Sequence, residues 1–126
     1  MRTGETRTQG DYDMMSNTSR TDESEQNDEL TEEWSTLTGF KRDILLALAE
    51  IADSPKKSYG LAIKRALEDD YESDVNHGRL YPNLDELRDL GLIEKSELDK
   101  RTMRYELTER GYAILKVRRD RLNDAL

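Results

Sequence analysis

Cysteine is absent from this chain of 126 residues, and histidine occurs once, at position 77. The lack of cysteine excludes disulfide bonds, thiol nucleophiles and thiolate metal sites. The sequence also contains no glycine-rich phosphate loop and no paired-carboxylate motif for acid–base chemistry. We therefore expect no enzyme activity, no metal and no cofactor, and His77 fits the start of a helix better than the role of a catalytic base.

Long apolar runs are lacking as well. No stretch of the sequence is apolar over the length that a membrane-spanning helix requires. Residues 1–20 have no apolar core of the kind that a signal peptide contains. The sequence therefore predicts a cytoplasmic protein that makes no membrane contact.

Charge is distributed unevenly along the chain, whose net charge is −8. Residues 1–36 contain three basic and ten acidic side chains, whereas residues 37–126 contain 17 basic and 18 acidic ones. Residues 1–29 are polar and contain too few apolar side chains to offset the entropy cost of ordering. We predict a disordered acidic tail over residues 1–29 and one folded domain over residues 30–126. Leu30 and Trp34 either dock on this domain, within the subunit or across a dimer, or form a patch for a partner.

Two helices are predicted next. The first begins after an N-cap at Thr38 and ends at Asp53-Ser54-Pro55. Its apolar side chains have helical spacing and leave little of its surface for water, so it is central or lies at an interface: Phe40, Ile44, Ala47, Leu48 and Ile51. The second helix follows Ser58 and ends in the acidic run 68–74. This run is interpreted as a solvated face, because a calcium loop would need a twelve-residue ligand pattern that is missing.

A third helix is predicted from an N-cap at Asn76 to a glycine stop at Gly91. Leu80, Leu84 and Leu87 share one face, which we expect to be buried. Pro82 is tolerated only near a helix start, so the helix begins close to residues 77–79 or bends at the proline. The polar side chains of its first turns can donate to phosphates and base edges: His77, Arg79, Tyr81 and Asn83.

After Gly91 the apolar period changes from about 3.6 to 2, which is typical of strands. Residues 92–98 and 103–107 are predicted to form a hairpin whose turn is the polar segment 99–102. Lys100 and Arg101 make the turn basic, and Arg104 follows closely. By itself this could be an ordinary exposed turn, but next to the preceding helix it is the pattern of a winged helix-turn-helix on DNA.

The final helix is predicted from an N-cap at Thr108 to the end of the chain. Its apolar stripe extends beyond what a small domain can cover, which favours pairing with a second subunit. With the first helix, it supplies the expected dimer interface: Phe40, Ile44, Tyr112, Leu115 and Leu122.

Over residues 37 to about 122 the sequence resembles the PadR family of transcriptional regulators. The resemblance rests on three segments and on Tyr59-Gly60: Gly78-Arg79-Leu80-Tyr81-Pro82-Asn83-Leu84, Leu87 to Ile93, and Tyr105-Glu106-Leu107-Thr108-Glu109-Arg110-Gly111. It implies a mainly α winged helix with a small β hairpin, acting as a homodimer that binds double-stranded operator DNA, usually as a repressor. The length resembles the short subfamily, in which the first and last helices make the dimer. The alternative is a winged helix that binds only proteins.

The sequence departs from that family in charge. The tip is less basic than is usual for the family, and acidic residues follow Asn83 on the third helix: Asp85, Glu86 and Asp89. Arginine outnumbers lysine, 13 to 7, beside abundant acids, as in proteins of salt-loving archaea. At molar salt, phosphate attraction is largely screened. We therefore expect a halophilic protein in which base contacts and shape fit carry more of the binding; the effector and the operator stay open.

Overall fold

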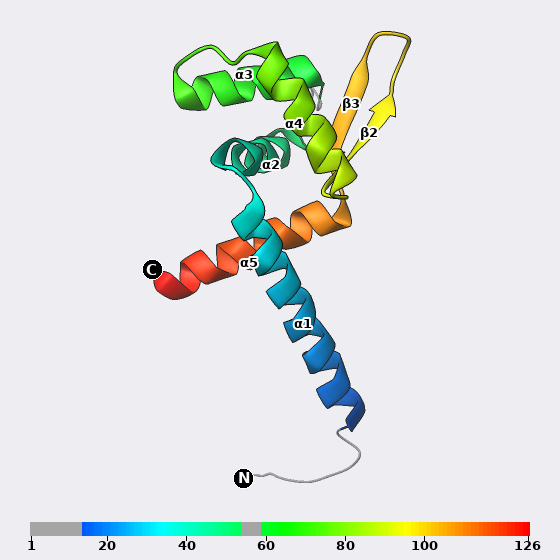
Figure 1. The fold of residues 1–126 in the computed structure, drawn as a ribbon, viewed down its shortest axis with the longest axis vertical. Coiled ribbons are helices and arrows are strands. Elements are labelled where there is room, and N and C mark those ends of the chain that lie inside the picture. Colours follow the sequence, from blue (N-terminus) through cyan, green and yellow to red (C-terminus); the bar gives the residue numbers. More distant parts are fainter. Residues whose placement is uncertain (1–13, 54–58) are drawn as a thin grey trace.

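The computed structural model describes residues 14–53 and 59–126, with side chains from residue 24 onward. The described residues form helices and one antiparallel hairpin (Figure 1). In chain order these elements are α1 (Met14–Thr36), α2 (Gly39–Ile51), α3 (Gly60–Tyr71), α4 (His77–Asp89), β2 (Ile93–Glu97), β3 (Met103–Leu107) and α5 (Glu109–Ala125). This is the winged helix that the sequence predicts: α2, α3 and α4 followed by the hairpin as the wing.

The core lies between α2, α3, α4 and the base of the wing. Leu80, Leu84 and Leu87 of α4 are fully buried, as their common helical face predicts. They pack in one cluster with apolar side chains from α2, α3 and both strands. Burial of a leucine side chain contributes about 1.5–3 kcal/mol, so this face fixes how α4 sits and directs its opposite face outward.

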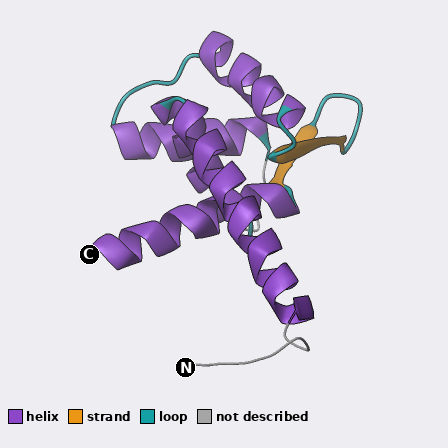
Figure 2. Cartoon of the chain, turned by 60° about the horizontal axis from the view of Figure 1, so that its bottom comes forward, coloured by secondary structure: helices purple, strands orange, loops and turns teal. Residues whose placement is uncertain are grey.

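Helices α1 and α5 cross each other below this core, and the N-terminal part of α1 extends away from the rest of the chain (Figures 1 and 2). Leu30 is buried in the core cluster and Trp34 packs partly against it. Arg110 of α5 also forms an ion pair with Glu33 at 2.7 Å. Leu30 and Trp34 therefore dock on the domain, which is one of the two expected alternatives.

Helix α1 differs from the expectation of a disordered tail over residues 1–29. It begins at Met14, so residues 14–29 are helical here, while residues 1–13 of that tail lie outside the described residues. At the C-terminal end of α1, packing of Leu30 and Trp34 on the domain stabilises a helix that its own sequence pattern does not predict. Ser58, the expected cap of α3, also lies outside the described residues.

Three helices begin at the caps that the sequence predicts, whereas α3 begins after Tyr59, which makes no side-chain cap. The side chains of Thr38, Asn76 and Thr108 accept hydrogen bonds from the backbone N–H groups of Lys41, Gly78 and Gly111, respectively. Gly91 follows α4 with φ of +77°, a left-handed conformation that glycine adopts without strain. The strands pair from Ile93 opposite Leu107 to Glu97 opposite Met103.

A tight joint connects α5 to the end of α4. The Thr108 hydroxyl donates to the carbonyl oxygen of Gly91 at 2.6 Å, and the Thr108 amide donates to that of Leu92 at 3.1 Å. At Gly111 a Cβ atom would lie 2.1 Å from the Leu92 carbonyl oxygen, so α5 approaches this backbone as closely as only glycine allows. The end of α4, the wing and the first turn of α5 therefore meet at this joint.

Two of the expected interface residues need correction. Phe40 and Ile44 belong to the buried core of the subunit, with 6% and 0% of their surface exposed. The apolar spacing correctly identifies the buried face of α2, but it does not tell whether the subunit core or a second subunit covers that face. Leu46, on the other side of α2, is the exposed leucine of this helix.

Candidate DNA-binding face

The exposed face of α4 begins at its N-cap and carries two pairs of stacked side chains. His77 stacks on Tyr81, with ring centroids 5.7 Å apart and planes 8° apart. The Tyr81 ring lies against Gly60 at the start of α3, where a Cβ atom would meet its hydroxyl oxygen at 2.4 Å. The guanidinium of Arg79 lies over the ring of Phe40 at 3.9 Å. These contacts set the directions of three of the four predicted α4 residues.

Asn83, the fourth predicted α4 residue, bonds to its own helix. Its side-chain nitrogen donates to the backbone carbonyl of Arg79 at 2.7 Å. This contact orients the amide, which leaves the side-chain oxygen as the group best placed to accept from a ligand. His77 and Tyr81 therefore lie on one flank of α4, with Tyr81 against the start of α3, whereas Arg79 and Asn83 lie on the flank towards Phe40 of α2.

The start of α4 is held by a carboxylate from α3. Glu68 accepts hydrogen bonds from the Lys64 ammonium at 2.7 Å and from the Val75 amide at 2.9 Å. The hydrogen bond from Lys64, followed by that from Val75, holds the pKa of Glu68 below its usual value. The first acid of the run 68–74 is thus an anchor for the loop that leads into α4.

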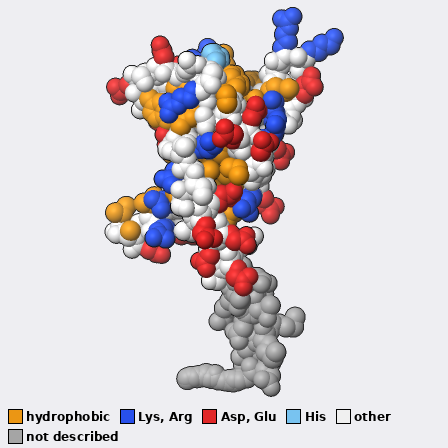
Figure 3. Space-filling view, in the orientation of Figure 1, with side chains coloured by type: hydrophobic (Ala, Val, Ile, Leu, Met, Phe, Trp, Pro, Cys, Tyr) orange, Lys and Arg blue, Asp and Glu red, His pale blue; other side chains and the backbone are white. Residues whose placement is uncertain are grey.

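The wing tip is an ordered turn that presents two cations. Asp99 accepts hydrogen bonds from the Arg101 and Thr102 amides at 2.9 and 3.0 Å, and the bond from Arg101 is the main reason that its pKa is lowered. Lys100 and Arg101 are exposed, and basic side chains project from the hairpin tip in the space-filling view (Figure 3). A structured loop with outward cations can approach a phosphate backbone.

Arg104 is placed differently from the tip residues. It lies on β3, where its guanidinium pairs with Glu106 at 3.0 Å and is about one third exposed. Its backbone bridges to that of Tyr59, which ties the wing to the start of α3. Its Nε atom is buried without a partner among the described residues. Arg104 therefore connects the wing to α3 and is less accessible than Lys100 and Arg101.

A cleft of about 520 Å³ separates the start of α3 from the wing. Its lining includes two residues that the sequence analysis did not select, Tyr59 and Leu61, next to Tyr81 and Arg101. The motif Tyr59-Gly60 was the signal that could have identified them. The cleft therefore brings together the start of α3, Tyr81 of α4 and Arg101 of the wing.

The acids of α4 are paired with cations of the same subunit. The Glu86 carboxylate lies 2.7 Å from the Lys41 ammonium, and Asp85 lies 3.8 Å from both Lys95 and Arg88. Asp89 lies 3.6 Å from Arg88. These pairs reduce the negative potential that α4 would otherwise present to an anionic ligand.

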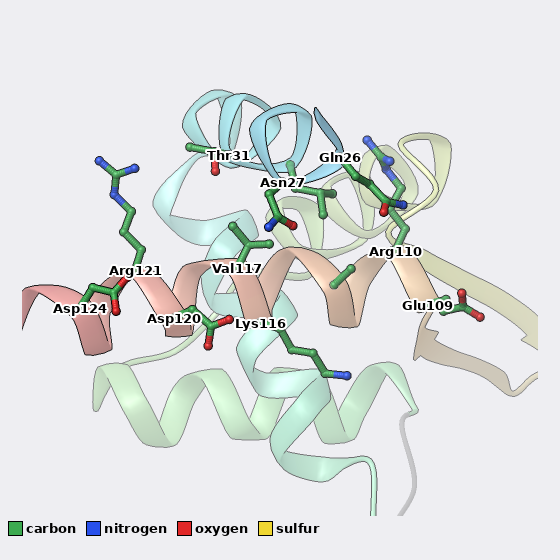
Figure 4. A pocket seen from close by; sticks show the side chains of 12 residues that line it. Gln26, Asn27, Thr31, Glu109, Arg110, Lys116, Val117, Asp120, Arg121 and Asp124 are labelled. Atoms are coloured by element: carbon green, nitrogen blue, oxygen red, sulfur yellow. The ribbon is translucent and has the colours of Figure 1, made fainter. Parts of the chain in front are cut away.

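A further hollow of about 720 Å³ lies between α1 and α5 (Figure 4). Apolar side chains contribute to its lining, and the charged ones all come from α5: Glu109, Arg110, Lys116, Asp120, Arg121 and Asp124. Three cations and three anions give this lining no net charge, so it does not select a ligand by the sign of its charge. No cluster of three or more metal-ligating side chains occurs among the described residues.

Known proteins share this fold and much of the sequence. The family model of the PadR-like transcriptional regulators matches residues 47–117. The chain belongs to the PadR-like family of transcriptional regulators. A structure of RosR from H. salinarum, grown from NaBr, is 51% identical with a TM-score of 0.61, over 71% of this chain and 77% of that one. The complex structure of hsRosR-S1 is 52% identical with a TM-score of 0.60, over 71% and 73%. No curated protein matched the sequence.

PadR-like regulators bind DNA, so the chain is a DNA-binding transcriptional regulator and not an enzyme. This favours DNA binding over the alternative of a winged helix that binds only proteins. Within the described part of the chain, every helix is too short or too polar to cross a membrane. The PadR-like fold also explains the joint positions of α4 and the wing, which are the two elements that winged helices bring to DNA.

Proposed function

We propose that the protein is a homodimeric repressor that recognises a specific operator through α4 and contacts the DNA backbone through the wing. The observation that carries this proposal is that Tyr81 of α4 and Arg101 of the wing tip line the same cleft at the start of α3. An α-helix fits the major groove of DNA, and a wing alongside it reaches the neighbouring backbone or minor groove.

The roles within this face follow from side-chain chemistry. Arg79 and Tyr81 are assigned to base edges, with His77 and Asn83 beside them, because arginine and asparagine are frequent readers of guanine and adenine. Lys100 and Arg101 are assigned to the sugar-phosphate backbone, since flexible cations at a tip supply affinity rather than sequence information. Arg104 supports the wing and is the least accessible member of the set.

Selection of bound duplexes from random DNA, followed by titration, tests these roles. The double variant Arg79→Ala, Tyr81→Ala should lose preference for the selected sequence, with about 1–3 kcal/mol lost for a base-reading arginine. Lys100→Ala with Arg101→Ala should weaken binding to all sequences similarly. Arg121→Ala, at an exposed position of α5 outside the apolar groove, is the matched control and should bind like the wild type. Unchanged sequence preference in the first variant would exclude α4 as the reader.

An apolar groove supports a second copy of the chain as the dimer partner. The groove has a volume of about 900 Å³ and lies between α2, the end of α1 and α5. Tyr112, Leu115 and Leu122, three of the expected interface residues, line it together with Leu46. Leu46 and Leu122 are each nearly half exposed in the subunit. An apolar face of this kind gains stability when a partner covers it.

Light scattering at micromolar concentration tests the dimer. The wild type should have the mass of two chains, whereas Tyr112→Ala with Leu115→Ala, or Leu122→Glu alone, should shift the mass towards one. Leu98→Glu, at an equally exposed leucine next to the wing tip, should leave the mass unchanged. A wild-type protein with the mass of a single chain would refute the proposed dimer and leave DNA binding by α4 as a separate question.

Repression is inferred from the family resemblance and from the proposed dimer. A dimer that covers two half-sites blocks other proteins from the same DNA. In transcription in vitro from a promoter that overlaps the selected site, added protein should lower the transcript level. A rise in the transcript level would identify an activator instead.

A further inference from the structure

The guanidinium of Arg79 has an aromatic ring beneath it. Its central carbon lies 3.9 Å from the ring centroid of Phe40, closer than the other arginine–ring pairs of the described residues, which are at 5.0 and 5.7 Å. Phe40 itself is 6% exposed, whereas Arg79 is exposed. The ring therefore belongs to the core, with one face covered by a side chain that points to solvent.

A second aromatic side chain, that of Tyr71, braces the ring of Phe40. Tyr71, at the end of α3, packs against it with ring centroids 6.4 Å apart and planes tilted by 34°. The Tyr71 hydroxyl donates a short hydrogen bond to the carboxylate of Asp43, one turn after Phe40 on α2. Burial, together with this bond, raises the pKa of Tyr71 to about 12. The hydroxyl thus stays protonated under ordinary conditions, and the brace persists.

Arg79 differs from other arginines of this region in its ion pairing. Arg88 and Arg104 lie within 4.0 Å of carboxylates of the same subunit. The ion pairs formed by the described residues do not include Arg79. An aromatic face attracts a cation without neutralising it, so Arg79 is oriented while its five N–H donors remain available.

We propose that Phe40 is a positioning residue for DNA recognition: its ring, braced by Tyr71 and Asp43, is a platform that holds Arg79 ready for the operator. The proposal rests on the proposed role of Arg79 as a reader. An arginine that is already ordered loses less side-chain entropy on binding. The platform affects DNA binding only through Arg79. Because Arg79 is proposed to read bases, the platform strengthens binding to the operator more than binding to other DNA.

A double-mutant cycle on the full-length protein tests the platform. Phe40→Leu keeps an apolar side chain in the core and removes the aromatic face. It should weaken binding to the duplex selected by the wild type about two- to tenfold, with binding to a scrambled duplex of equal length unchanged. In the Arg79→Ala background the same substitution should have no further effect on the selected duplex.

Ile44→Val, in the same core one turn further along α2, is the matched control. Its effect on binding should be the same with and without Arg79, as for any residue with a purely structural role. If the effect of Phe40→Leu also persists fully in the Arg79→Ala background, the platform is overturned while the reader role stands. If Arg79→Ala itself leaves binding to the selected duplex unchanged, the reader role fails and the platform with it.

A measurement on the wild type keeps the proposal falsifiable even if Phe40→Leu does not fold. The Arg79 δ-methylene protons should show an upfield NMR shift in the free protein, caused by the ring current of Phe40. Random-coil shifts for these protons would overturn the platform. Tyr71→Phe, which removes the brace but keeps both rings, should reduce the shift.

Discussion

Replacement of Gly111 by alanine tests the joint between α5 and the wing. The new Cβ atom would lie 2.1 Å from the carbonyl oxygen and 3.2 Å from the carbonyl carbon of Leu92, and 3.0 Å from a methyl group of Leu107. The Leu92 carbonyl cannot move freely, because it accepts the amide hydrogen of Thr108 at 3.1 Å. Relief of the overlap therefore requires a shift of α5 or loss of that hydrogen bond.

The magnitude follows from two opposing contributions. Overpacking of this kind costs about 1–3 kcal/mol, and removal of a glycine from a helix returns about 0.5–1 kcal/mol. The net expectation for Gly111→Ala is a loss of about 1–2 kcal/mol in the free energy of unfolding, which lowers the Tm by about 4–16 °C for a domain of this size. The steric contribution outweighs helix propensity because the clash is with backbone atoms.

Thermal unfolding followed by circular dichroism measures this loss. All variants must be compared at one protein concentration, because subunit association would raise the apparent stability. Gly39→Ala is the matched control: a Cβ atom at that helical glycine has no neighbour within 4 Å, so its stability should be unchanged or slightly higher. Equal midpoints for Gly111→Ala and Gly39→Ala would refute the close approach of α5 to the wing.

Three further predictions concern pH and salt. The pKa of Tyr71 is raised to about 12, so the stability it contributes is complete below its ordinary value near 10 and is lost as the pH rises through 12; Tyr71→Phe should flatten this alkaline loss in urea titrations. The pKa of Glu68 is lowered, so its contribution is present above its ordinary pKa and is lost as the pH falls below it; Glu68→Gln should reduce the acid dependence of the unfolding midpoint, and an unchanged dependence would argue against the anchor. Affinity for the selected duplex should depend only weakly on the potassium chloride concentration between about 0.5 and 2 M. The double variant Asp85→Asn, Glu86→Gln should show a steeper loss of affinity with salt, because the basic side chains that pair with these acids become available to phosphates. A wild-type affinity as salt-sensitive as that of basic repressors would contradict this prediction.

Sequence periodicity predicted the parts of the fold that are controlled locally. The leucine face of α4, the left-handed glycine after it and the two strands all depend on residues within a few positions of one another. The caps at Thr38, Asn76 and Thr108 are likewise local hydrogen bonds. For these elements, local propensity and tertiary packing favour the same structure, so the sequence pattern was sufficient to predict them.

The remaining features depend on partners distant in sequence. Helix α1 contains few apolar residues, and it packs through Leu30 and Trp34 on a helix about 80 residues later. The cover of the apolar face of α2 was ambiguous, because its spacing does not distinguish the subunit core from a second subunit. The stacking of Arg79 on Phe40 joins residues 39 positions apart, for which no local pattern exists.

The joint at Thr108 also has a consequence for the geometry of the operator. One residue separates β3 from α5, and its hydrogen bonds to Gly91 and Leu92 leave no slack between the reading helix and α5. In the proposed dimer, the distance between the two reading helices is then a fixed property of the protein. The spacing between half-sites should therefore be the same in all of its operators and should equal a whole number of DNA helical turns. The wing tip, in contrast, can change in length without altering that spacing.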